Sequence, residues 1–167
     1  MIHIYCGDGK GKTTASVGLS ARMAGYGKKV LFVQFLKGSY TGELEMLRDS
    51  KNITVMRCDK NYGFFRSMSE EDKESIISCH NSNLNFVFNN MHSFDMIVLD
   101  EIFAACNYGL ADEDTVKKIT EEYKGELVMT GRDPEAWFLE KADYVSEVQK
   151  VKHPYDKGIT AREGVEF

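Results

Sequence analysis

The chain has 167 residues, of which 43% are hydrophobic, 28% are charged and only two are prolines. This length favours a single domain over residues 1–167, and the composition is typical of a globular protein rather than a disordered one. The formal net charge of -5 disfavours a nucleic-acid partner. Phosphate backbones require clustered basic residues, and here Lys and Arg are scattered among acids.

Cysteine usage and the amino terminus predict a cytoplasmic protein. The cysteines are far apart in the sequence and form no C-x-x-C pair, so we expect all four to be reduced: Cys6, Cys58, Cys79 and Cys106. The first residues lack the charged region of a signal peptide, and no apolar run is long enough to cross a bilayer. We therefore expect a soluble protein without a membrane partner.

Short apolar runs alternate with longer amphipathic stretches, a pattern typical of βαβ units. The predicted strands cover residues 1–6, 30–35, 53–58, 94–101, 126–132 and 143–149. The run "VLFVQF" is continuously apolar apart from one Gln, which predicts a strand that is buried on both faces. The fold class is therefore α/β, with a mainly parallel sheet flanked by helices.

Three helices are predicted between these strands. The first covers residues 13–27, and the second runs from Ser69, a suitable N-cap, to Met91. The third begins at Pro134, and the chain after Val151 has no regular pattern. The buried stripe of the second helix is predicted to contain Ile76, Ile77, Leu84, Val87, Phe88 and Met91.

The stretch "GDGKGKTT" lies between the first strand and the first helix and is one residue short of a standard phosphate-binding loop. The usual pattern is G-x-x-x-x-G-K-[ST], and the place of its first glycine is taken by Cys6. A glycine-rich turn whose backbone amides and following helix amino terminus point at an anion indicates a nucleotide triphosphate site. Its candidate residues are Gly7, Asp8, Gly9, Lys10, Gly11, Lys12, Thr13 and Thr14.

The loop also implies a divalent metal ion, Mg²⁺ or Mn²⁺. The Thr13 hydroxyl is one candidate ligand, and Lys12 supplies a positive charge for the phosphates. Asp100 and Glu101 follow the apolar run "MIVL", where acids of this fold class face the phosphates and the metal. The sequence does not decide which of these two acids is closer to the metal.

Several common nucleotide enzymes lack support in the sequence. There is no N-K-x-D stretch for guanine, no paired-cysteine zinc motif of thymidine kinases and no Arg-rich lid. A small kinase or ATPase, and a non-enzymatic ATP-binding switch, remain as alternatives.

The chain resembles the P-loop type of ATP:corrinoid adenosyltransferases over nearly its whole length. The resemblance is carried by the short loop at residues 7–14, "VQFLKG" at 33–38, "VLDE" at 98–101, "TGR" at 130–132 and "VSEVQKVKHPYDKGITAREGVEF" at 145–167. It implies a RecA-like P-loop fold and transfer of the 5′-deoxyadenosyl group of ATP to Co(I) of a corrinoid, with release of triphosphate. It also implies a homodimer and an electron-donating flavoprotein or reduced flavin.

The resemblance further implies roles for individual residues. Arg22 and Arg132 are expected to contact the nucleotide or its phosphates, while Lys12 stabilises the leaving group. Family members are thought to displace the lower axial ligand of the corrinoid with aromatic side chains, and Phe64 matches their Gly-Phe segment. The family's nearby tryptophan is replaced by Arg66, so that its role falls to Phe65 or to Tyr62. The alternative is that these aromatic side chains belong to the core. For His153, a structural role and a contact with nucleotide or partner are both open.

Overall fold

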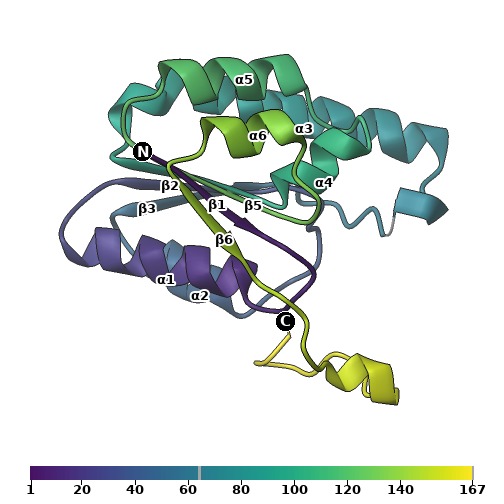
Figure 1. Cartoon of the computed structure of the whole chain (residues 1–167). Coiled ribbons are helices and arrows are strands. Elements are labelled where there is room, and N and C mark those ends of the chain that lie inside the picture. Colours follow the sequence, from purple (N-terminus) through teal and green to yellow (C-terminus); the bar gives the residue numbers. More distant parts are fainter. Residues whose placement is uncertain (64, 167) are drawn as a thin grey trace.

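Among the residues that the structure describes, six strands form one parallel sheet with the order β3-β2-β4-β5-β1-β6 (Figure 1). The computed structural model describes residues 1–63 and 65–166. The strands are β1 (Ile2–Cys6), β2 (Val30–Gln34), β3 (Ile53–Arg57), β4 (Met96–Asp100), β5 (Glu126–Thr130) and β6 (Tyr144–Glu147). Each lies within a run that the sequence predicts as a strand, which confirms the α/β fold class.

In the described part of the chain, six α-helices and three short 3-10 helices connect and follow the strands. The α-helices are α1 (Lys12–Gly25), α2 (Glu43–Asp49), α3 (Glu70–Asn90), α4 (Ile102–Asn107), α5 (Glu113–Glu122) and α6 (Ala136–Lys141), and the 3-10 helices are η1 (Phe65–Ser67), η2 (Met91–Ser93) and η3 (Pro154–Lys157). The predictions of α1, α3 and α6 are confirmed, and Ser69 caps α3 by accepting a hydrogen bond from the Asp72 amide. The sequence reasoning missed α2, α4 and α5.

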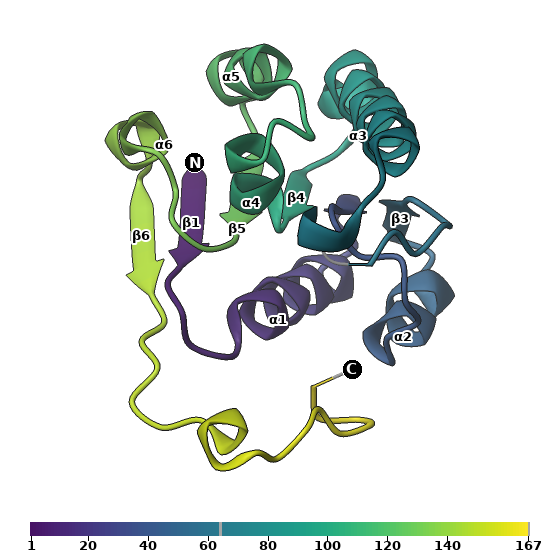
Figure 2. The ribbon, with the colours of Figure 1, turned by 90° about the vertical axis from the view of Figure 1, so that its right-hand side faces the viewer.

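The helices cover the two faces of the sheet as separate layers (Figures 1 and 2). On one face, α3, α4, α5 and α6 pack on inward side chains that include Leu31 and Val33. On the other face, α1 and α2 pack on side chains that include Val30 and Phe32. Successive residues of β2 point to opposite faces of the sheet, and all of them are buried. The prediction of a strand that is buried on both faces is therefore confirmed.

The strand register brings polar residues together at the carboxyl edge of the sheet. Gln34 at the end of β2 lies opposite Asp100 at the end of β4, and Tyr5 of β1 lies opposite Thr130 at the end of β5. In open parallel sheets, ligands bind beyond this edge, where the loops after the strands meet. The phosphate-type loop that follows β1 therefore opens onto the same edge as Asp100.

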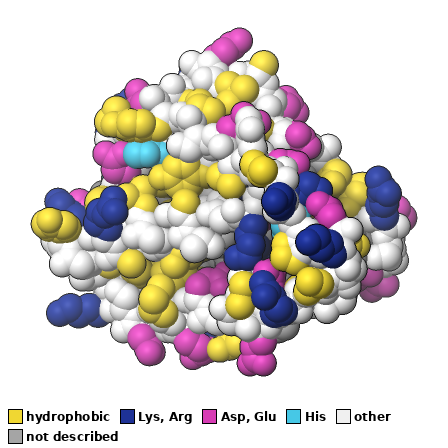
Figure 3. Space-filling view, turned by 60° about the horizontal axis from the view of Figure 1, so that its bottom comes forward, with side chains coloured by type: hydrophobic (Ala, Val, Ile, Leu, Met, Phe, Trp, Pro, Cys, Tyr) yellow, Lys and Arg dark blue, Asp and Glu magenta, His cyan; other side chains and the backbone are white. Residues whose placement is uncertain are grey.

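After β6, the chain runs back beneath α1 and α2 and is largely exposed apart from a few partly buried residues (Figure 2). The expectation of an irregular segment after Val151 holds for the described residues up to 166 apart from η3, a short 3-10 helix. On the face shown in Figure 3, several Lys and Arg side chains lie close together on the right with Asp and Glu among them, and others lie along the left edge. Within residues 1–63 and 65–166, no helix has the length and apolar character needed to cross a membrane.

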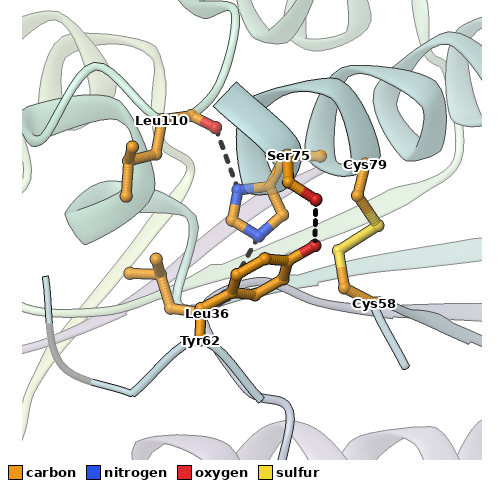
Figure 4. The surroundings of a disulfide bond; sticks show 7 residues. Leu36, Cys58, Tyr62, Ser75, Cys79 and Leu110 are labelled. Carbon is orange, nitrogen blue, oxygen red and sulfur yellow. Dashed lines mark hydrogen bonds between the residues drawn. A yellow bond between two sulfur atoms is a disulfide. The ribbon is translucent and has the colours of Figure 1, made fainter. Parts of the chain in front are cut away.

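The expectation that all four cysteines are reduced is wrong for two of them. Cys58 and Cys79 form a disulfide (Figure 4), while Cys6 and Cys106 are free and buried. The two partners are 21 residues apart in sequence, but α3 passes beside the end of β3 and brings their Cα atoms to 6.1 Å. Spacing along the chain could not reveal this approach, and the cysteines no longer support a reducing compartment.

The disulfide should contribute measurably to stability. It closes a loop of about 20 residues, for which the chain-entropy model gives about 3 kcal/mol. We expect the double variant Cys58→Ala, Cys79→Ala to melt roughly 6–12 °C below the wild type in calorimetry. Adding dithiothreitol should lower the wild type to a similar temperature and leave the variant unchanged. Equal melting of oxidised wild type and variant would contradict this contribution.

Candidate nucleotide site at the carboxyl edge of the sheet

The loop between β1 and α1 is shaped by close backbone contact and by one unusual backbone angle. The Gly9 amide donates a hydrogen bond to the Val148 carbonyl at 2.7 Å. A Cβ atom at Gly9 would lie 2.7 Å from the same oxygen, so only glycine fits. Gly11 has φ of 120° directly before the first residue of α1, a conformation that favours glycine. The loop thereby presents its backbone at the amino terminus of α1, as anion binding requires.

Lys12 is held inside the loop rather than in solvent. Its side chain is only 7% exposed, and its Nζ donates a hydrogen bond to the Gly9 carbonyl at 2.8 Å. Burial lowers the pKa of the Lys12 ammonium, and the nearby Glu101 carboxylate opposes this shift. A buried cation with so few partners would gain strongly from a bound anion.

Asp100 is the centre of a buried hydrogen-bond cluster. Its Oδ1 accepts from the Thr13 hydroxyl at 2.9 Å and from the Thr130 hydroxyl at 2.7 Å. Its Oδ2 accepts from Lys37 Nζ at 2.8 Å and from Gln34 Nε2 at 3.5 Å. The Asp100 side chain is fully buried, so this cluster fixes the Thr13 hydroxyl at the start of α1.

Glu101 is placed differently although it is the next residue. It adopts a left-handed conformation with φ of 62°, and its amide donates to the Thr130 hydroxyl at 3.0 Å. Burial raises the pKa of the Glu101 carboxyl, and the Asp100 carboxylate raises it further, while Lys37 and Lys12 act in the opposite direction. A divalent cation beside Glu101 would relieve this penalty on its charged form.

A cavity of about 750 Å³ lies over the loop. This volume is within the usual range for small-molecule sites. Most of the predicted site residues line it together: Asp8, Gly9, Lys10, Gly11, Lys12, Thr13, Thr14, Glu101 and Arg132. These residues come from the segments that follow β1, β4 and β5, so the parallel topology assembles the cavity from segments far apart in sequence.

Other predicted residues do not line this cavity. Gly7 has φ of 101° and lies against Val148, where it shapes the turn. Asp100 lies behind Thr13, and Arg22 is exposed on α1. Phe64 lies outside the described residues.

The cavity also contains residues that sequence reasoning did not assign to it: Val17, Lys37, Thr41, Gly42, Glu43, Gly164, Val165 and Glu166. The Thr41 hydroxyl is buried and finds no hydrogen-bond partner among the described residues. Lys37 follows β2 closely, and its place after a buried parallel strand was a usable signal. His153 lines the cavity as well, and its Nδ1 accepts from the Tyr155 amide at 3.2 Å, so both interpretations of this residue have support.

The aromatic segment between β3 and α3 lies apart from the cavity lining. The Phe65 ring stacks on Tyr108 with centroids 4.4 Å apart, and it packs against a small cluster with Met68, Ile76 and Leu110. The Tyr62 hydroxyl lies 2.8 Å from Ser75 Oγ on α3 (Figure 4). The exposed fraction of Tyr108 is 50%, so part of this pair of stacked rings is accessible to a ligand.

Comparison with known proteins gives a consistent answer. The model of the family described as "ATP:corrinoid adenosyltransferase BtuR/CobO/CobP" matches residues 1–167. The corrinoid adenosyltransferase of Escherichia coli (strain K12) is 31% identical over 169 residues, covering 100% of this chain and 85% of the relative. That of Pseudomonas aeruginosa is 32% identical over 172 residues, covering 98% and 82%, and corrinoid adenosyltransferase CobA of Salmonella typhimurium is 29% identical over 169 residues, covering 100% and 85%. With its loop, its parallel sheet and this match over the full chain, the protein belongs to the ATP:corrinoid adenosyltransferases.

Proposed function

We propose that the cavity at the carboxyl edge binds ATP and that the chain transfers the 5′-deoxyadenosyl group of ATP to Co(I) of a corrinoid. The electron pair of Co(I) forms the Co–C5′ bond, the C5′–O bond breaks, and its electron pair leaves with the triphosphate. Cobalt thereby passes from Co(I) to Co(III). Because Co(I) is itself a strong nucleophile, the protein needs no general base.

The observation that carries this proposal is the cluster of cations around the short loop in a chain of this family. Lys10, Lys12 and Arg132 line one cavity together with the loop backbone. They would stabilise negative charge as it develops on the departing triphosphate. The same side chains would hold ATP in place, so that C5′ meets the cobalt in line.

The residues at this site fit a magnesium ion. Mg²⁺ prefers oxygen ligands and is commonly held by one or two carboxylates together with phosphates. Thr13, Asp100 and Glu101 offer such oxygens, and burial already penalises the charge of Glu101. Mg²⁺ held in this way takes further ligands from substrate phosphates and water, so the triphosphate of ATP would complete the coordination. Bound Mg²⁺ would neutralise charge on the triphosphate.

One assay tests the function against its alternatives. Protein, ATP, Mg²⁺ and chemically reduced cobalamin are combined, and the corrinoid spectrum and the phosphate products are followed. Adenosylcobalamin and inorganic triphosphate should appear in equal amounts. A kinase or ATPase would release ADP, and a non-enzymatic switch would bind ATP without forming either product. ADP without adenosylcobalamin would reject the proposal.

We extend the proposal to the remaining expectations from the sequence. The chain is expected to act in the cytoplasm as a single domain over residues 1–167, and the family resemblance implies a homodimer that receives electrons from reduced flavin or a flavoprotein. The single sheet that contains β1 to β6 supports one domain. Sedimentation at several concentrations would test the dimer.

The aromatic segment should act on the reduction of Co(II) and not on alkyl transfer. We expect Phe65→Ala to be slow when flavin must produce Co(I), and nearly unimpaired when Co(I) is supplied chemically, since the nucleophile is then already formed. A purely structural role would lower both rates together with stability, by up to about 3 kcal/mol for this half-buried ring.

Both assays and a melting curve distinguish these roles. Phe86→Ala is the matched control, because Phe86 is an exposed phenylalanine on α3, 38% accessible. The same comparison on Tyr62, and on Phe64, would show which aromatic ring acts on the corrinoid. Equal losses in both assays for all three variants would remove the proposed role in reduction.

A further inference from the structure

Lys37 closes a triangle with two of the oxygens proposed for the metal. Its Nζ donates to Thr13 Oγ1 at 3.0 Å and to Asp100 Oδ2 at 2.8 Å. Thr13 Oγ1 in turn donates to Asp100 Oδ1 at 2.9 Å. The ammonium therefore sits between the hydroxyl and the carboxylate and neutralises the buried Asp100 charge.

An ammonium in this position and a divalent ion on the same oxygens would compete. Mg²⁺ binds oxygen at about 2.0–2.1 Å, so an ion on Thr13 Oγ1, which accepts from Lys37 Nζ at 3.0 Å, would lie within about 5 Å of the ammonium. The two positive charges would also repel at this separation. Binding of a metal ion therefore favours withdrawal of Lys37 from the Thr13–Asp100 pair. Lys37 also lines the cavity, so the space proposed for the phosphates is adjacent to it.

The backbone that carries Lys37 is held by a buried histidine. Leu36, the preceding residue, has φ of 57°, an unfavourable conformation for leucine that requires support from its surroundings. Its amide donates to His80 Nε2 at 3.2 Å, and His80 Nδ1 lies 2.9 Å from the Leu110 carbonyl (Figure 4).

His80 can serve both partners only in one form. Its side chain is fully buried, and burial lowers its pKa, so the ring is neutral at physiological pH. Nδ1 then carries the proton for Leu110, and Nε2 accepts from Leu36. The ring of Phe35 packs against it edge-on at 5.1 Å. This arrangement ties the turn after β2 to α3 directly before Lys37.

We propose that Lys37 is a built-in counter-ion that holds the Thr13–Asp100 pair before metal binding and moves to the triphosphate when the metal ion enters, and that His80 is its positioning residue. The proposal rests on the proposed nucleotide function of this cavity. It assigns to Lys37 two successive partners, the Asp100 carboxylate and the leaving triphosphate. It assigns to His80 an effect on metal binding that is transmitted through Leu36.

Metal affinity without nucleotide is the direct test. Mn²⁺ binding is measured by electron paramagnetic resonance for wild type, Lys37→Met and Lys37→Gln. Both variants lack the competing charge and should bind Mn²⁺ about tenfold more tightly than wild type. Lys28→Met is the control for net charge, because Lys28 pairs with Asp95 on the surface at 3.4 Å. It should leave Mn²⁺ affinity unchanged.

Binding of inorganic triphosphate tests the second partner. In calorimetric titrations, both Lys37 variants should bind triphosphate several-fold more weakly, and Lys28→Met should match wild type. Glutamine retains a donor for Asp100 and provides a folded variant if methionine unfolds the site. Any result in which neither variant binds Mn²⁺ more tightly than wild type, including no detectable binding by any protein, overturns the proposal. These titrations contain no corrinoid, so failure of adenosyl transfer would be seen separately.

Two variants of His80 test its positioning role, one that removes its hydrogen bonds and one that restores them. His80→Phe keeps a ring but removes both hydrogen bonds, and it should shift Mn²⁺ affinity in the same direction as Lys37→Met. His80→Gln offers an amide donor and a carbonyl acceptor, and it should restore the wild-type affinity. A lowered melting temperature with unchanged Mn²⁺ affinity in His80→Phe would make this residue merely structural.

Discussion

Replacing Lys12 with alanine is expected to lower the rate of adenosyl transfer about 10²–10³-fold, the usual effect of losing one preorganised group that stabilises developing charge. Lys12 is buried at the amino end of α1, where the helix dipole and the loop amides already favour an anion. Its Nζ is held by the Gly9 carbonyl, so the charge is in place before the leaving group forms. Its removal should lower kcat even at saturating ATP.

The measurement is the turnover of chemically produced Co(I) with ATP and Mg²⁺. Lys28→Ala is the control, because it removes a lysine that pairs with Asp95 outside the cavity. Triphosphate should remain the phosphate product of the residual reaction. Full activity of Lys12→Ala at saturating ATP would show that the triphosphate is stabilised elsewhere.

Asp100→Asn and Glu101→Gln should both lower metal-dependent turnover, by about 10–100-fold, but they should differ in stability. Asp100 accepts from Thr13, Thr130 and Lys37 while fully buried. Asparagine removes the charge that pairs with Lys37, which should destabilise the protein by about 3 kcal/mol.

Glu101→Gln should have the opposite effect on stability. The raised pKa of Glu101 means that its charged carboxylate lowers the free energy of unfolding. This destabilisation is fully present at neutral pH and is lost when the pH falls below the ordinary pKa of a glutamate, where the carboxyl group is protonated in both the folded and the unfolded protein. The glutamine variant should be at least as stable as wild type at pH 7, and this difference should vanish on acidification.

Melting curves between pH 4 and pH 8 and Mg²⁺ titrations of turnover would check this pair of variants. If Glu101 is the closer metal ligand, Glu101→Gln should require the larger increase in Mg²⁺ concentration. The reverse order would transfer that role to Asp100. Equal destabilisation by both variants would contradict the distinct environments of the two acids.

The sequence by itself determined the features that depend on neighbours along the chain. The continuous apolar run of β2 and the strand–loop–helix order around Gly9 and Lys12 are local patterns, because burial on both faces and close phosphate contact restrict residue types at fixed spacing. The position of Glu101 after an apolar strand was informative for the same reason. These patterns were sufficient to predict the fold class and the part of the cavity lining that the loop and Glu101 supply.

Only the tertiary structure decided the contacts between distant segments. The disulfide of Cys58 with Cys79, and the support of Leu36 by His80, depend on how α3 crosses the sheet beside β2 and β3. The placement of Lys37 on Asp100 depends on the pairing of β2 with β4, whose partners are separated by 66 residues or so in the chain. Such contacts follow from packing of the whole core, because the spacing of residues along the chain does not show which turn of a helix will lie beside which strand.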